Sequence, residues 1–203
     1  MPENKTNNQD VIVEVYNKYI DQLNAMDLEA VCLNSGSVMV DKDHIEVKFF
    51  NDRYIVDVAN RNIKDKQNNN VDPYRSSIIL HYLVVADGTP VSGKWISFRQ
   101  LPHGLFYAKT VEEAMVSVAE KYGSNADLFM EKVQGIGGRR SSEFEYGVIV
   151  NGFSRVSLLM VLYPESEEFG SEARVFYDQS ISHYLKTDIV KLVTIHCLKL
   201  LLK

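Results

Sequence analysis

The most constraining feature of this sequence is the run 156–162, VSLLMVL, which is apolar on both faces of a predicted strand. A strand of this kind lies inside a sheet, with a neighbouring strand on each side. Two further strands are predicted at 143–151 and 173–177, and short connections join both of them to the central run. Short connections favour antiparallel pairing, so we expect three antiparallel strands near the end of the chain.

A second region of period-two alternation precedes them. Residues 44–49 and 53–58 alternate between apolar and polar side chains, and the turn-forming pair Asn51-Asp52 separates the two segments. This pattern predicts a β-hairpin. We expect the hairpin to join the later strands in one antiparallel sheet of about five strands.

The remaining apolar residues recur at the three- and four-residue spacing of amphipathic helices. The main helices are predicted at 9–23, 73–86, 111–122 and 187–202. Runs of strands that are separate from runs of helices are typical of the α+β class, with helices covering the sheet. We therefore predict a disordered polar tail at residues 1–8 and a single α+β domain at residues 9–203.

Composition narrows the classes of partner. A net charge of -5 and a pI near 5.6 argue against nucleic acid or an anionic membrane surface as the main partner. The first residues lack the apolar core of a signal peptide, and we expect a cytoplasmic protein without a membrane span. Cys32 and Cys197 lack the spacing of a metal site, so they are predicted to be buried thiols and no cofactor is predicted.

The candidate site lies in the segment 86–107, ADGTPVSGKWISFRQLPHGLFY. Alternation around a short strand places Trp95 and Arg99 on one face, and Pro102 and Gly104 indicate a turn. Residues 105–107 are predicted to be extended again. Arginine binds carboxylate or phosphate groups and aromatic rings stack on flat ligands, so the segment is predicted to bind a small anionic or aromatic ligand. The predicted ligand-binding residues are Trp95, Arg99, His103, Tyr107 and His183.

Other interpretations remain open. The segment 86–107 could be structural, with Trp95 in the core and Arg99 paired with a carboxylate. No complete catalytic motif is present, so no catalytic residue is assigned, although His103 or His183 could act as an acid-base group in an enzyme. A structural or assembly protein without a pocket is a further alternative. The leucine-rich helix at 187–202 raises the hypothesis of a homodimer.

The sequence resembles a known family, the domain of unknown function 3786 family. The resemblance rests mainly on the segment DGTPVSGKWISFRQLPHG, and it is supported by Gly137-Gly138, by Arg155–Leu158 and by Phe176-Tyr177-Asp178. Gln100 stands where the family usually has glutamate, and His103 where glycine is common. The resemblance implies an accessory protein of anaerobic, corrinoid-linked metabolism. Some members carry a cysteine-rich iron-sulfur module, which this chain lacks.

Overall fold

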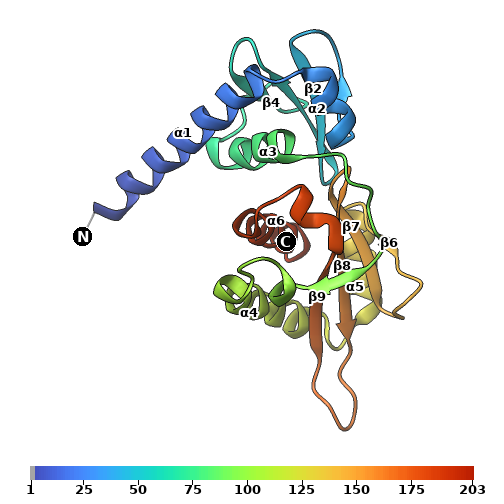
Figure 1. The fold of residues 1–203 in the computed structure, drawn as a ribbon. Helices are drawn as coiled ribbons and strands as arrows, with labels where there is room; N and C mark the ends of the chain where they lie inside the picture. Colours follow the sequence, from blue (N-terminus) through green and yellow to red (C-terminus); the bar gives the residue numbers. More distant parts are fainter. Residues whose placement is uncertain (1–2) are drawn as a thin grey trace. The chain divides into compact units, whose positions relative to one another are not determined.

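The computed structural model describes residues 3–203, in which six α-helices accompany two antiparallel sheets of four and five strands (Figure 1). The predicted α+β class is confirmed. The chain divides into two compact units. The first unit comprises the residues up to Thr89 together with His183–Leu185, and the second comprises Pro90–Ser182 and Lys186–Lys203.

The first unit contains a four-stranded antiparallel meander in the order β1-β2-β3-β4. The predicted hairpin is confirmed as β2 and β3, whose register runs from Phe49 opposite Asp52 to His44 opposite Asp57. The elements of this unit are α1 (Glu3–Asn24), α2 (Leu28–Ser35), β1 (Val38–Met39), β2 (His44–Phe49), β3 (Asp52–Asp57), β4 (Asn62–Lys64) and α3 (Pro73–Val85).

Helix α3 lies in the core of the first unit. The Asp72 side chain accepts a hydrogen bond from the backbone N–H of Arg75 at 2.9 Å, which satisfies an otherwise unpaired amide at the start of the helix. Apolar side chains surround most of the helix, and Ile79 and Leu80 are fully buried. His81 is also fully buried, and its Nδ1 lies 2.7 Å from the hydroxyl of Tyr19, which accounts for this polar ring in the core.

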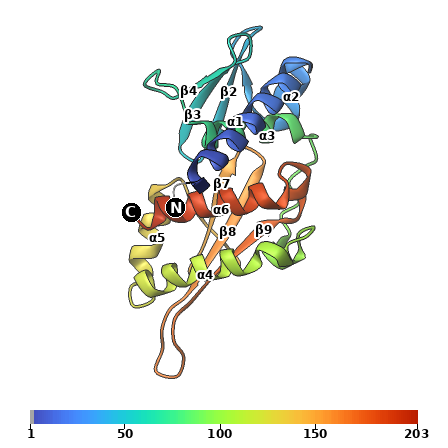
Figure 2. The same cartoon turned by 90° about the vertical axis from the view of Figure 1, so that its left-hand side faces the viewer.

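The second unit contains a five-stranded sheet in the order β5-β9-β8-β7-β6. Figure 2 shows α4 and α6 lying across one face of this sheet, and α4 contacts β9 and α6 extensively. The elements are β5 (Trp95–Ser97), a 3-10 turn η1 (Phe98–Gln100), α4 (Leu105–Tyr122), α5 (Ala126–Gly135), β6 (Arg139–Arg140), β7 (Gly147–Phe153), β8 (Val156–Tyr163), β9 (Glu172–Asp178), a 3-10 turn η2 (Gln179–His183, which ends in the first unit) and α6 (Thr187–Leu201).

The predicted central strand is confirmed as β8, which pairs with β7 on one side and β9 on the other. All of its residues except Tyr163 are buried. The face towards α4 and α6 carries Tyr177 of β9, whose hydroxyl lies 2.9 Å from Thr194 Oγ1 in α6. Removing so many apolar side chains from water is the main stabilising contribution to this unit.

The expectation of one shared sheet was wrong in one respect. The hairpin of β2 and β3 belongs to a separate sheet from the strands that follow residue 143. The outermost strands of the first sheet, β1 and β4, have only two and three residues. Such short edge strands offer little backbone for further pairing, so the meander ends as a sheet of its own.

The predicted extended segment 105–107 was also wrong, because these residues form the first turn of α4. The helix follows a tight turn in which the Gly104 N–H donates to Leu101 O at 2.8 Å. Leu105 and Phe106 are largely exposed on this turn, at 70% and 81%. Apolar side chains that face solvent disrupt the helical pattern, so the triplet looked like a strand in sequence.

Two further expectations concern organisation. The single domain over residues 9–203 stays a prediction beside the two compact units. Of the predicted tail at 1–8, residues 1 and 2 lie outside the described residues, and residues 3–8 lie in α1. No helix within residues 3–203 combines the length and apolarity that a bilayer crossing requires.

Candidate functional site

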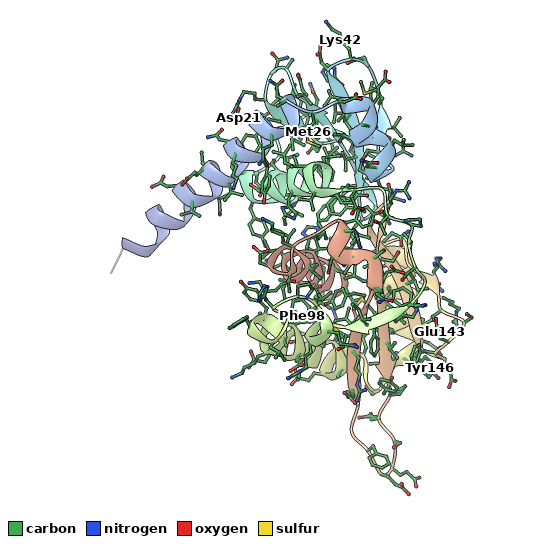
Figure 3. All side chains as sticks on the ribbon, in the orientation of Figure 1. Asp21, Met26, Lys42, Phe98, Glu143 and Tyr146 are labelled. Carbon is green, nitrogen blue, oxygen red and sulfur yellow. The ribbon has the colours of Figure 1, made fainter. Side chains whose placement is uncertain are left out.

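Trp95 is fixed on the face of the second sheet that lies opposite α4 and α6. Its strand β5 pairs with the end of β9, where Trp95 lies opposite Asp178. The half-buried ring packs against Ile149, Leu159 and Val161, and its Nε1 donates a hydrogen bond to Glu143 Oε1 at 2.9 Å. Figure 3 shows Glu143 on one side of the strands and Phe98 on the side of the helices. Trp95 is therefore an anchor between sheet and loop.

Arg99 lies after the end of β5, in the 3-10 turn η1. The strand stops because the side chain of Gln100 accepts hydrogen bonds from the backbone N–H and the hydroxyl of Ser97, at 2.8 and 3.1 Å. The resulting turn brings Arg99 to α4, where its Nε and Nη2 donate to Glu112 at 2.6 and 2.8 Å. The pairing with a carboxylate that the alternative, structural interpretation of this segment expects for Arg99 is therefore present, while ligand binding by Arg99 stays a prediction. These hydrogen bonds hold the pKa of Glu112 below its ordinary value.

A groove of about 480 Å³ runs between α4 and β9, and we call it the α4–β9 groove. Its walls are mainly apolar, and two ion pairs stand at its rim, Arg99 with Glu112 and Arg174 with Glu172. All four charged side chains are more than half exposed. The main apolar lining residues are Phe98, Val111, Met115, Val116, Val175 and Phe176.

His103 and Tyr107 lie outside the lining of this groove. His103 occupies the left-handed backbone region, with φ 59°, and its ring centre is 6.4 Å from that of Phe106. Tyr107 lies on α4, with the Lys191 Nζ of α6 4.5 Å from the centre of its ring. Of the four residues predicted within 95–107, only Arg99 lines the α4–β9 groove.

His183 belongs to the first compact unit. Its Nδ1 lies 2.7 Å from Asp87 Oδ2 and 3.1 Å from Thr89 Oγ1. The hydrogen bond from His183, followed by those from Thr89, lowers the pKa of Asp87 to about 2. The next residue, Tyr184, donates to the backbone carbonyl of Thr89. The histidine is therefore oriented by a carboxylate, although its ring stays half exposed.

Asp178 is a second carboxylate that organises the segment around β5. Its side chain is almost fully buried at 1% exposure and accepts hydrogen bonds from Ser92, Gly93 and Ser180. Burial raises the pKa of Asp178, but the hydrogen bonds outweigh burial and the net shift is downward. Asp178 therefore has a structural explanation, since it ties the loop before Trp95 to the end of β9.

Sequence reasoning missed most of the groove. Glu112, Met115 and Val116 come from α4, and Glu172 and Arg174 come from β9. On α4 the only available signal was the helical stripe of apolar residues, which equally indicates packing. The contact partners of His183 were easier to find from the sequence, because Asp87 and Thr89 flank Gly88 in the segment 86–107 that was already singled out.

Comparison with known proteins gives one match. A family model described as a domain of unknown function, DUF3786, matches residues 27–198. No curated protein and no solved structure matches the chain.

Proposed function

Because this chain belongs to the DUF3786 family, whose description gives no activity, we propose a function from the geometry of the chain itself. The protein binds a small, largely apolar molecule with an anionic group in the α4–β9 groove. The observation that carries this proposal is a mainly apolar groove of about 480 Å³ with arginines at its rim. Ligand sites typically combine such a volume with apolar walls and a few convergent polar groups.

The charge of the ligand follows from Arg99. Its planar guanidinium is already arranged for two parallel hydrogen bonds to a carboxylate, which Glu112 accepts in the free protein. Both side chains are about half exposed, and ion pairs of this kind contribute little net stability. A ligand carboxylate or phosphate can therefore take the place of Glu112 at modest cost.

The preference of the groove for an aromatic ligand follows from the side chains of its walls. Phe98 and Phe176 line the groove beside Met115, which supplies a flexible apolar surface. Flat apolar molecules bury surface efficiently against such side chains. An aromatic acid therefore fits both the walls and the rim.

Binding explains the groove better than catalysis does. The residues described as its lining include no histidine or cysteine. The pKa of Glu112 is lowered by Arg99, which makes this carboxylate a weak base. An accessory binding role is therefore the first candidate, and its link to anaerobic, corrinoid-linked metabolism stays a prediction from the family resemblance.

The test measures binding of benzoate, indole-3-acetate and phenyl phosphate by calorimetry and thermal shift. We expect Arg99→Gln to weaken binding of an accepted probe by about ten- to a hundredfold, because a charge-assisted bidentate contact is lost. Arg53→Gln is the matched control, since Arg53 pairs with a carboxylate, Glu46, but does not line the α4–β9 groove. Binding that is equal in both variants, or absent for every anionic aromatic probe, contradicts the proposal.

The Asp87–His183 pair favours a second candidate, an enzyme that uses His183 as a general base. The 2.7 Å contact to Asp87 fixes the ring through Nδ1, which leaves Nε2 as the atom for proton transfer. A screen of carboxylic and phosphate esters tests this candidate. Activity that is lost in His183→Gln and retained in His103→Gln would support it, whereas equal rates in all three proteins would refute it.

A further inference from the structure

One side of β9 is an open sheet edge along most of its length. Strand β5 pairs only with Phe176–Asp178, so no strand of residues 3–203 covers Glu172–Val175 on that side. The backbone N–H of Gln179 donates to Lys94 O at 2.8 Å, which shows that residue 179 faces the β5 side. Because backbone direction alternates along a strand, the N–H and C=O groups of Val175 and Ala173 also face this edge.

The open edge lies where β5 would pair with β9 if β5 were longer. The chain leaves the sheet after Ser97, where the 3-10 turn η1 begins, and the α4–β9 groove follows the edge from there. Ala173 and Val175 are buried, but a sheet edge that no strand covers is a template for pairing with another extended backbone. The question is which strand is complementary to it.

The charge pattern of β9 is complementary to a second copy of the same strand. Glu172 and Arg174 alternate with Ala173 and share the sheet face opposite α4, and both are more than half exposed. When two β9 strands pair antiparallel with Ala173 opposite Ala173, each Glu172 lies directly opposite the Arg174 of the other copy. Centring the pair on Glu172 or Arg174 instead places like charges opposite each other. A centre at Val175 would involve Phe176, which already pairs with Ser97.

We propose that this protein forms a two-fold symmetric homodimer in which the β9 strands of two copies pair antiparallel about Ala173. The two five-stranded sheets then form one continuous sheet. In this register the backbone groups of Ala173 form the central hydrogen-bonded pair, and two Glu172–Arg174 contacts flank it. The contact shares Glu172, Ala173 and Arg174 with the lining of the α4–β9 groove, but it does not involve Arg99, so binding through Arg99 is tested separately.

Charge reversal tests the register. Glu172→Lys places lysine opposite arginine, and Arg174→Glu places glutamate opposite glutamate, so each variant repels its own copy. We expect the wild type to sediment as a dimer and each variant to show a dissociation constant raised by at least about tenfold. An equimolar mixture of the two variants restores opposite charges and should form a heterodimer. Restored association also shows that both variants are folded.

Backbone pairing is tested separately by Ala173→Pro. Proline is tolerated at a free strand edge but cannot donate the central hydrogen bond, so the dimer should dissociate while circular dichroism stays unchanged. Glu46→Lys and Arg53→Glu are the controls, because they reverse the charges of a partly exposed cross-strand ion pair in the other sheet. Neither control should change the association.

Three outcomes would overturn the inference: a wild type that stays monomeric across a concentration series, a dimer that is insensitive to both charge reversals, or a variant mixture that fails to associate. These outcomes leave the ligand proposal standing if an aromatic acid still binds the wild type through Arg99. Conversely, a charge-dependent dimer that binds no probe confirms the β9 contact and removes the ligand proposal.

Discussion

Single residues in this protein owe their properties to partners that lie far away in sequence. Asp87 and His183 are 96 positions apart, yet Asp87 Oδ2 and His183 Nδ1 lie 2.7 Å from each other. The sequence indicates His183 as a candidate, because it lies in the polar stretch 178–184 that follows the predicted strand 173–177. Asp87 stands in the segment 86–107 that the sequence singled out, but its contact with His183 depends on the fold. Long-range pairs of this kind arise only when the chain has folded.

The Asp87–His183 contact predicts a measurable titration. The pKa of Asp87 is lowered from 3.8 to about 2, mainly by the hydrogen bond from His183. A lowered carboxyl pKa stabilises the folded state above the unfolded pKa, and this stabilisation is lost as the pH falls from about 4 towards 2. We expect carbon NMR to show that His183→Gln returns the pKa of Asp87 towards 3.8. An unchanged Asp87 titration in that variant would show that His183 is not the main cause.

At the scale of elements, β5 and the turn after it show how a short strand is anchored. Trp95 is half buried against Ile149, Leu159 and Val161 on the face opposite α4 and α6. A fully buried tryptophan contributes more than a ring of this kind. The contribution of Trp95 to stability therefore comes from partial packing and from the hydrogen bond to Glu143.

We expect Trp95→Ala to reduce the free energy of unfolding by about 2 to 3 kcal/mol, which is below the cost for a fully buried aromatic ring. Trp95→Phe keeps most of the packing and loses the hydrogen bond to Glu143, so it should cost about 1 kcal/mol. Urea denaturation followed by circular dichroism measures both. A loss under about 0.5 kcal/mol for Trp95→Ala would show that the ring is a surface residue.

The start of α4 depends on one glycine. A Cβ atom at Gly104 would lie 2.1 Å from the carbonyl oxygen of Phe98, which is backbone and cannot move aside freely. We expect Gly104→Ala to destabilise the fold by about 2 to 3 kcal/mol and to displace Arg99 from Glu112.

Gly135 is the matched control, because a Cβ there meets nothing within 4 Å. Gly135→Ala should be neutral or stabilising by up to about 1 kcal/mol, since alanine favours helices. Thermal denaturation of both variants provides the comparison. Equal effects at the two glycines would contradict a steric role for Gly104.

At the scale of the whole molecule, the first compact unit is not continuous in sequence. It includes His183–Leu185, which begin with the last residue of η2 and precede α6. Tyr184 in this segment is fully buried, its hydroxyl donates to Thr89 O, and its ring centre is 6.1 Å from that of Tyr82. A fragment that ends at Thr89 therefore lacks part of its own core.

We expect a fragment of residues 1–89 to unfold at a lower denaturant concentration than the same residues in the full chain, because it cannot bury Tyr82 against Tyr184. Hydrogen exchange of α3 amides measures this difference. Tyr184→Phe in the full chain is the control, since it keeps the ring and loses only the hydroxyl. Equal protection in fragment and full chain would show that the returning segment is dispensable.

Local pattern was sufficient where neighbours in sequence make the structure. The α+β class, the hairpin of β2 and β3, the central position of β8 and the core helix α3 all followed from periodicity and turn residues. Each of these features depends on side chains that share a face within one element, and that arrangement is set by helical or strand geometry.

Tertiary structure decided the rest. It separated two sheets, extended α4 back to Leu105, and built a groove from Arg99, α4 and β9, while His103 and Tyr107 lie outside its lining. Sequence alone determined which side chains each element presents. Which of those side chains meet depends on how distant elements pack, and one sequence pattern is compatible with many such packings.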